Sequence, residues 1–273
     1  MRLSEVDQAH RLPGRCVFCG EGAPAQQQHD VNGFRIMRCE CGLVYSDPRV
    51  APQAQFARIY VEGYGRPSRP HPSQRPALSR LWRSIRGHYS ADAAVCKRWR
   101  AIRRWLPRRA RLRFLDVGCN IGDLVELISA ENPTWTVRGI EPSRHAAEVA
   151  RRHGLNVDCG FLEEAGYEED SFDVICAWDV IEHVPEPFGF LQTVRRVLAP
   201  GGRFITHCPN YESLRRRHEG PRWGVFLPEQ HLYHYTPQTL RRLFTEADAE
   251  VLHLGAGPMS LASRILAVAT WPD

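Results

Sequence analysis

The sequence of 273 residues predicts an α/β domain with a doubly wound, mostly parallel sheet. From residue 112 onward, short apolar segments alternate with longer segments in which apolar residues recur every three or four positions. The short segments indicate buried strands and the longer ones amphipathic helices. Strands separated by helices in this way form parallel βαβ units, which place helices on both faces of one sheet.

The elements of this domain follow one another regularly. Strands are predicted at residues 112–117, 136–140, 155–159, 172–178, 203–207 and 250–254. Helices are predicted at residues 122–130, 143–153, 188–198 and 236–247, and Ser143 is expected to cap the first turn of its helix. The strand at 203–207 is entered through Pro200-Gly201-Gly202, and residues 265–270 fit either a last strand or a terminal helix.

The chain divides into three predicted regions. Residues 12–47 form a small module rich in Cys, Gly and Gln, residues 48–110 form a linker with N-terminal helices, and residues 111–273 form the α/β domain. Within the linker, GRPSRPHPSQRP (65–76) contains too much proline for a helix or a central strand and predicts an exposed loop. Apolar residues then recur at helical spacing from Leu78 to Leu106, which predicts one or two amphipathic helices ending at Pro107.

The composition is that of an ordinary globular protein, with 43% hydrophobic and 25% charged residues. This excludes a mainly disordered chain, a collagen-like chain and a small disulfide scaffold. No apolar run approaches the roughly 18 residues that a membrane span needs, and the N-terminus lacks the apolar core of a secretory signal. We therefore expect a cytoplasmic protein, in which the nine cysteines are thiols or metal ligands rather than disulfides.

The net charge of +5 is unevenly distributed. Between Arg66 and Arg113, fourteen arginines and Lys97 stand against Asp92 as the single acid, so this segment carries +14 and the rest of the chain −9. Such a block could attract nucleic acid or a phosphorylated substrate. However, Lys97 is the only lysine of the chain, and this extreme use of arginine is typical of genome-wide base composition. A solvated helix surface is the interpretation we favour.

The most informative motif is Asp116-Val-Gly-Cys-Asn-Ile-Gly122, where a strand runs into a glycine turn and then a helix. Open α/β sheets bind nucleotide-like ligands at such turns, since glycine lets the backbone approach the ligand. A nicotinamide dinucleotide fingerprint would require glycine where Asn120 and Asp123 stand, so that interpretation fails twice. Glu141 ends the next strand, where a carboxylate can accept two hydrogen bonds from a ribose diol.

These residues resemble the first two motifs of the class I S-adenosylmethionine (SAM) methyltransferases. Further matches follow in order at residues 160–162, 172–185 and 198–202, so that the resemblance spans residues 112 to about 254. It implies a Rossmann-like methyltransferase domain that binds SAM; the alternative is an α/β domain without SAM. The cofactor-binding residues that it implies are Asp116, Gly118, Cys119, Asn120, Gly122, Glu141, Phe161, Leu162, Trp178 and Asp179.

The resemblance also assigns roles. The backbone amides from Gly118 to Gly122 would meet the methionine carboxylate, aided by the N-terminus of the following helix. Asp116 would order the turn or reach the methionine ammonium, and Glu141 would bind the ribose. Residues 160–162 match the loop that usually flanks the adenine.

Asp179-Val-Ile-Glu182-His183 has two interpretations. Similar strings bind a divalent metal in ubiquinone-type O-methyltransferases and in small-RNA 2′-O-methyltransferases, which would make Asp179, Glu182 and His183 the ligands of Mg²⁺. The same string also occurs in relatives without metal, where it shapes the wall of the site. We favour the second interpretation.

Candidate catalytic bases lie in the segment from Pro228 to Thr236, which resembles the Pro-x-x-His segment of glycan- and natural-product-modifying methyltransferases. His231 or His234 could take a proton from a hydroxyl acceptor, because the pKa of imidazole is near neutrality. Asp179 is a third candidate for a catalytic residue, and His207 a weaker one. Alternatively, one of the histidines caps the following helix or binds backbone.

Four cysteines in two close pairs, Cys16 with Cys19 and Cys39 with Cys41, predict a zinc site in the N-terminal module. Four ligands would make the zinc structural rather than catalytic. The second pair is one residue shorter than a standard zinc knuckle, so His29 is an alternative ligand. The module resembles the N-terminal zinc ribbon of some bacterial methyltransferases, a group in which Tyr60 and Tyr64 match a tyrosine pair often found near the cofactor; packing is their other interpretation.

The sequence therefore predicts a SAM-dependent methyltransferase for a small-molecule or glycan acceptor, with a hydroxyl oxygen as the favoured methyl acceptor, in natural-product or polysaccharide biosynthesis. The alternative is an RNA methyltransferase that uses the zinc ribbon and the arginine-rich segment to bind phosphates. A SAM-binding module without catalysis is a third class, which nothing in the sequence favours. Neither the acceptor nor the oligomeric state follows from the sequence.

Overall fold

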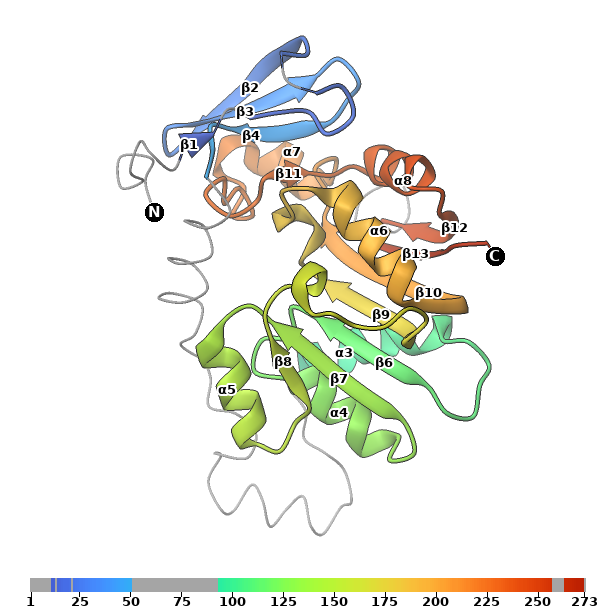
Figure 1. Ribbon diagram of the computed structural model, residues 1–273. Helices are drawn as coiled ribbons and strands as arrows, with labels where there is room; N and C mark the ends of the chain where they lie inside the picture. Colours follow the sequence, from blue (N-terminus) through green and yellow to red (C-terminus); the bar gives the residue numbers. More distant parts are fainter. Residues whose placement is uncertain (1–10, 13, 21, 51–92, 257–262, 273) are drawn as a thin grey trace.

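The computed structural model describes residues 11–12, 14–20, 22–50, 93–256 and 263–272 (Figure 1). The predicted proline-rich loop at 65–76, the first part of the predicted N-terminal helices, and Tyr60 and Tyr64 lie outside the described residues.

Within the described residues, the central sheet has seven strands in the order β12-β13-β10-β9-β6-β7-β8 (Figure 1). The four pairs from β10 to β8 are parallel, whereas β13 runs antiparallel to both of its neighbours. The predicted fold class is confirmed. The strands are β6 (Arg113–Val117), β7 (Thr136–Glu141), β8 (Val157–Cys159), β9 (Phe172–Trp178), β10 (Leu198–Pro209), β12 (Glu250–Gly255) and β13 (Arg264–Thr270).

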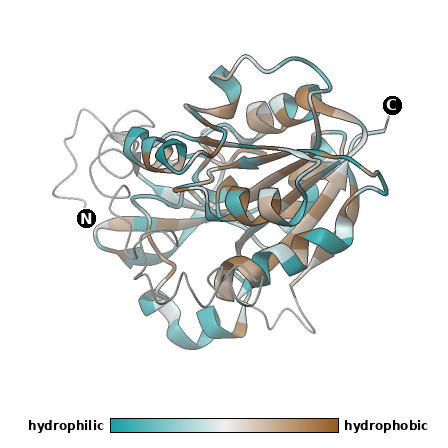
Figure 2. Cartoon of the chain, turned by 90° about the horizontal axis from the view of Figure 1, so that it is seen from below, coloured by the Kyte–Doolittle hydropathy of each residue, from teal (hydrophilic) through white to brown (hydrophobic). Residues whose placement is uncertain are grey.

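Helices cover both faces of this sheet. One face packs against α3, α4 and α5, and the other against α6 and α8, because alternate residues of each strand point to opposite faces. Figure 2 shows the hydrophobic residues of helices and strands gathered where the helices meet the sheet. The helices are α3 (Ala93–Ile102), α4 (Asp123–Glu131), α5 (Arg144–Arg152), α6 (Pro187–Val197) and α8 (Pro237–Glu246).

The local predictions agree closely with these bounds. β9 spans the predicted residues, and Ser143 caps α5 by accepting a hydrogen bond from the Ala146 amide at 3.3 Å. Residues 264–270 form a strand rather than a helix, with the Ile265, Ala267 and Ala269 side chains in one core and Val268 in the other. β10 is longer than predicted, since it includes Pro200-Gly201-Gly202, where its pairing with β9 is irregular.

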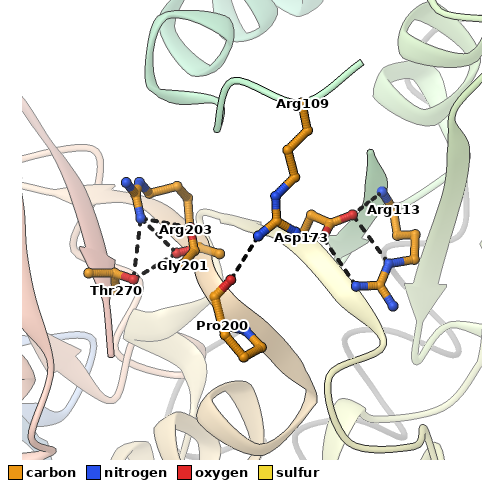
Figure 3. A network of polar contacts seen from close by, with 8 residues as sticks. Arg109, Arg113, Asp173, Pro200, Gly201, Arg203 and Thr270 are labelled. Carbon is orange, nitrogen blue, oxygen red and sulfur yellow. Dashed lines mark hydrogen bonds and ion pairs between the residues drawn. The ribbon is translucent and has the colours of Figure 1, made fainter. Parts of the chain in front are cut away.

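The one polar residue of β9, Asp173, joins several elements at the end of the sheet where β6 begins (Figure 3). Its carboxylate accepts hydrogen bonds from the Arg113 amide at 2.8 Å and from the guanidinium groups of Arg109 and Arg113. Arg109 also donates to the Pro200 carbonyl at 2.9 Å, and nearby Thr270 donates to the Gly202 carbonyl at 2.8 Å. These two arginines of the basic block therefore have a structural role.

The N-terminal module shares its sheet with the α/β domain. Its strands β2 (Ala25–Val31), β3 (Phe34–Cys39) and β4 (Val44–Asp47) are completed by β11 (Tyr233–His234), in the order β11-β4-β3-β2 (Figure 1). The short strands β1 (Arg11–Leu12) and β5 (Arg49–Val50) pair with each other. Residues of the module, including Leu43 and Tyr45, also belong to the same hydrophobic core as α6 and α8.

Candidate functional site

A cavity of about 560 Å³ opens at the carboxyl ends of β6, β7 and β9. This is where open α/β sheets bind their ligands, and the volume lies within the roughly 300–1,000 Å³ of small-molecule sites. The residues that line it come from α3, from the turns after β6, β7, β8 and β9, and from the first turn of α6.

The glycine turn after β6 forms one side of the cavity. Gly118 and Asn120 line it, and both adopt a left-handed backbone, with φ of +69° and +53°. A Cβ at Gly118 would lie 2.8 Å from the Val180 side chain, so this position has no room for one. Gly122 does not line the cavity; a Cβ there would meet Leu155 at 2.5 Å, which explains this glycine by packing between the turn and α5.

Glu141 ends β7 with its side chain at the cavity and only 4% of its surface exposed. One carboxylate oxygen accepts a hydrogen bond from the Asn120 amide at 2.8 Å and the other from the Ser143 amide at 2.9 Å. Burial raises the pKa of this carboxyl, and the two amides oppose that shift. Each oxygen keeps a second lone pair, so the group fits a diol with two hydroxyl donors.

Besides Gly122, two more of the expected cofactor residues lie outside the lining of the cavity. Cys119 is buried against Gly139. Asp116 is buried, and within the described part of the chain neither of its carboxylate oxygens has a hydrogen-bond partner. Burial raises the pKa of Asp116 to about 7, although the positive charge of Arg98 acts in the opposite direction. A further cation close to Asp116 would stabilise its ionised form, because the charge of Arg98 does not fully offset the effect of burial.

Phe161 and Leu162 line the cavity after β8, and Trp178, the last residue of β9, lines it together with Asp179. The Trp178 ring is stacked on His207, with the ring centroids 4.0 Å apart. Asp179 has a φ of +56°, and its carboxylate accepts from His207 Nδ1 at 3.1 Å and from Arg264 at 2.6 Å.

Although burial favours the neutral form of Asp179, these two partners and the charge of Arg98 hold its pKa below the usual value. Asp179 therefore remains a carboxylate at neutral pH and is able to bind a cation.

Arg98 on α3 also lines the cavity, with its guanidinium 5.2 Å from the centre of the Trp178 ring. Among the described residues of the lining, it is the only arginine or lysine. We did not single it out from the sequence, where it is one arginine among fourteen between Arg66 and Arg113. Its place beside the buried residues Val95 and Trp99, on the edge of the apolar stripe of α3, is a signal that could have distinguished it.

On the side of the cavity formed by η7 (Ile181–His183), Glu182, His183 and His231 bring one ligand atom each within 4.8 Å of one another. His183 lines the cavity, and the centroid of its ring is 4.7 Å from that of His231 behind it. Each imidazole donates from Nδ1 to a carbonyl, His183 to Gln230 at 3.1 Å and His231 to Val225 at 2.9 Å. In the neutral rings, Nε2 is therefore the nitrogen with a lone pair.

The charges of this cluster are suppressed by burial. Burial lowers the pKa of His183 to about 4 and that of His231 well below its usual range, while it raises the pKa of Glu182 well above the usual range. Within the described part of the chain, neither carboxylate oxygen of Glu182 has a hydrogen-bond partner.

The Mg²⁺ ligand set of Asp179, Glu182 and His183, which the sequence offered as the less favoured interpretation, does not form among the described residues. Asp179 follows β9 beside β10, where its amide donates to the His207 carbonyl at 2.8 Å and its carboxylate is bound by His207 and Arg264. His231 takes the third place in the group. One carboxylate and two imidazoles suit a transition metal such as zinc, whereas Mg²⁺ prefers oxygen ligands and water.

His234 lies outside the cavity lining, with 2% of its surface exposed. Its ring packs at 5.2 Å from Phe226, and burial together with the charge of Arg216 lowers its pKa to about 3. His231 is also outside the lining and contacts the ring of His183, which lines it. Of the histidines considered from the sequence, His183 is the one at the cavity, and we had considered it as a metal ligand or a wall residue rather than a base.

The four predicted zinc ligands, Cys16, Cys19, Cys39 and Cys41, do come together, with their sulfur atoms within 4.8 Å of one another. The Cys16 and Cys41 sulfurs are 3.4 Å apart. His29 is not part of the group and packs instead against Phe226, with ring centroids 5.7 Å apart. Four thiolates are a donor set that suits a tetrahedral zinc ion.

The described residues contain no helix long and apolar enough to cross a membrane.

A family model described as "Methyltransferase domain" matches residues 88–254, more than half of the chain. The chain belongs to this family. It carries a class I SAM-dependent methyltransferase domain, as the order of its motifs predicts.

The curated relatives of this chain include a named O-methyltransferase and an uncharacterized protein. A ubiquinone biosynthesis O-methyltransferase of Thiobacillus denitrificans is 36% identical over 167 residues, which cover 55% of this chain and 71% of that protein. An uncharacterized 37.1 kDa protein in transposon TN4556 of Streptomyces fradiae is 38% identical over 106 residues, or 37% of this chain. The match spans only 31% of the Streptomyces protein's own length.

Solved structures share the fold. A SAM-dependent methyltransferase of Thermotoga maritima has a TM-score of 0.52 at 21% identity, covering 71% of this chain and 94% of its own. The SpnF [4+2]-cyclase has a TM-score of 0.53 at 18% identity, covering 71% of this chain and 92% of its own. Since a methyltransferase and a cyclase share this fold, the activity has to be argued from the site.

Proposed function

We propose that this chain transfers a methyl group from SAM to a hydroxyl oxygen of a small-molecule or glycan acceptor in a biosynthetic pathway. The observation that carries the proposal is Glu141: a buried carboxylate at the end of β7, oriented by two backbone amides, beside a cavity of about 560 Å³ in a methyltransferase-family domain. That arrangement supports binding of a nucleoside by its ribose.

The lining residues fit the other parts of SAM. Phe161 and Leu162 are apolar and suit the adenine, and Arg98 is the cation that suits the methionine carboxylate. Asp179, held as a carboxylate, and Asp116 behind the turn suit the ammonium. Bound SAM would supply a methyl group that is already activated by the positive charge on its sulfur. The protein then has to align the acceptor and receive its proton.

We propose His183 as the base that receives the proton of the acceptor hydroxyl. It lines the cavity, its Nδ1 is engaged by the Gln230 carbonyl, and its Nε2 carries the lone pair in the neutral ring. His231 packs behind it and is proposed to orient it, which modifies the expectation that His231 itself is the base. His234 is omitted from the catalytic group because it lies outside the cavity lining.

The relatives named ubiquinone biosynthesis O-methyltransferase support a hydroxyl oxygen of a small molecule as the first acceptor to test. Purified full chain would be incubated with methyl-labelled SAM and a panel of phenols, catechols and sugars, and also with an extract of the source cells. Label in a phenolic or sugar product is the expected result. Label found only in extract, and lost after nuclease treatment, would transfer the assignment to RNA. No labelled product in the presence of SAM binding would indicate a binding module.

We also propose a structural zinc ion at Cys16, Cys19, Cys39 and Cys41. Elemental analysis of the purified protein is expected to give one zinc per chain held by these thiols. Cys39→Ser should lose that zinc and lower the melting temperature, since a structural zinc contributes directly to folding. A Cys39→Ser protein with unchanged zinc content and melting temperature would refute the site.

A further inference from the structure

The segment that carries His231 is bound to the N-terminal module. β11 begins two positions after His231 and is the fourth strand of the module's sheet, in which Tyr233 pairs with Tyr45 and His234 with Val44. Cys41 lies three positions before the start of β4, so one strand separates the cysteine cluster from the chain around His231.

Ser46 of β4 makes two successive contacts with this segment. Its hydroxyl donates to the His231 carbonyl at 2.9 Å, and its amide donates to the Leu232 carbonyl at 3.0 Å. The side chain is buried, with 1% of the residue exposed, so water does not compete for these bonds. A buried carbonyl that loses its donor is destabilising, which makes the geometry of this contact well determined.

The opposite side of the same segment is bound by η7. His183 Nδ1 donates to the Gln230 carbonyl at 3.1 Å, and the Leu232 amide donates to the Glu182 carbonyl at 2.9 Å. Residues 230–232 are therefore held between the cavity wall on one side and Ser46 on the other. A substitution at Ser46 that moves residues 230–232 would therefore also move the side chains of His183 and His231.

The hydrogen bonds of Ser46 indicate which ring nitrogen of His234 carries the proton. A serine hydroxyl has one hydrogen, and that of Ser46 is donated to the His231 carbonyl. Toward His234 Nε2, 3.4 Å away, the same oxygen can therefore only accept. A hydrogen bond at this contact requires the neutral ring of His234 to carry its proton on Nε2, with Nδ1 unprotonated.

We propose that Ser46 is a positioning residue through which the N-terminal module sets the place of His231, and thereby of His183, at the acceptor side of the cavity. This rests on the proposed function in assigning the acceptor to that side. It gives the cysteine module a role in the reaction without placing any of its residues at the substrate. The cofactor side, at Glu141 and Arg98, has no contact with Ser46 among those that the structure describes.

The test uses the full chain with ¹⁵N-labelled histidine. In the unmodified protein, the ring nitrogens of His234, assigned with a His234→Gln variant, are expected to report protonation at Nε2. A His234 ring protonated at Nδ1 would overturn the proposal without any variant of Ser46, so loss of folding in a mutant cannot hide a failure.

Ser46→Ala is then expected to shift the ring resonances of His231 and His234 and to leave the Kd for SAM within twofold. With an acceptor identified, kcat/KM for that acceptor should fall at least tenfold while the KM for SAM stays unchanged, and Ser46→Thr should restore part of the loss. The matched control is Thr270→Val, which removes another buried hydroxyl-to-carbonyl bond, at Gly202, and should leave the histidine resonances as they are.

Unchanged resonances of both histidines in a folded Ser46→Ala protein would refute the positioning role. Equal losses of acceptor turnover in Ser46→Ala and Thr270→Val would do the same, because the effect would then be one of stability. Failure of the unmodified protein to bind SAM would contradict the proposed function instead, and the histidine spectra would remain a separate measurement of the Ser46 contact.

Discussion

Replacing Glu141 with alanine is expected to weaken SAM binding by roughly two orders of magnitude while the fold persists. Each carboxylate oxygen uses one lone pair on a backbone amide, at 2.8 and 2.9 Å, and has one left for a ribose hydroxyl. A hydrogen bond to a charged group contributes about 1.5–3 kcal/mol. Two such bonds at the lower end amount to about 3 kcal/mol, or roughly a 150-fold increase in Kd.

The fold should survive because two effects of this substitution oppose each other. The amides of Asn120 and Ser143 lose their acceptor, at a cost of about 1 kcal/mol each, while a buried carboxylate whose ionisation burial disfavours is removed. The melting temperature should therefore change by only a few degrees.

Isothermal titration calorimetry with SAM measures the Kd, and a thermal melt checks the fold. The matched control is Glu164→Ala, which removes the same charge from an exposed side chain of the same cavity and should change the Kd by less than threefold. A Glu141→Ala protein with a native melting temperature and a Kd within threefold of the unmodified protein would refute the ribose assignment. A large effect of Glu164→Ala would show that general charge, not hydrogen bonding, governs the affinity.

Three further results are expected. Arg98→Gln should raise the Kd for SAM about tenfold or more, and should leave the Kd for methylthioadenosine, which lacks the amino acid carboxylate, unchanged; equal losses for both ligands would contradict a carboxylate contact. SAM affinity should rise with pH between 6 and 8, because Asp116, with a pKa of about 7, has to lose its proton to interact favourably with a cation. Calorimetry in buffers of different ionisation enthalpy should detect this proton release, and Asp116→Asn should abolish it; release that persists in the variant would exclude Asp116 as its source. Gly122→Ala should lower the melting temperature by roughly 2–8 °C, because its φ of +84° is strained for alanine and its Cβ would meet Leu155. An unchanged melting temperature would indicate that the turn adjusts freely.

The sequence was sufficient for features that depend on neighbours along the chain. β9, the capping of α5 by Ser143 and the placement of Glu141 at the end of β7 follow from residue periodicity and from turn chemistry within a few positions. The ambiguity at residues 265–270 had the opposite cause. An apolar run of that length suits a buried helix as well as a strand, and only pairing with β10 and β12 decides between them.

The candidate site was predicted in part. The motif order placed Gly118, Glu141, Phe161 and Trp178 at one cavity, because the carboxyl ends of parallel strands meet at the same edge of a sheet. Arg98 was missed, since the long-range packing of α3 alone selects it from the other arginines of its segment.

Residues close in sequence can separate, and residues far apart can meet. Asp179 and Glu182 differ by three positions, yet Asp179 turns to His207 and Arg264, while Glu182 joins His183 and the distant His231. The spacing of the four cysteines predicted their cluster, but not that β11 would complete the sheet of their module or that Ser46 would bind the His231 carbonyl across 185 positions. By itself, the sequence determined the strands, helices and local motifs, because these depend on short-range periodicity. The tertiary structure alone decided which side chains share the cavity and which hydrogen bonds orient them, because those depend on burial and on contacts between segments that the chain keeps far apart.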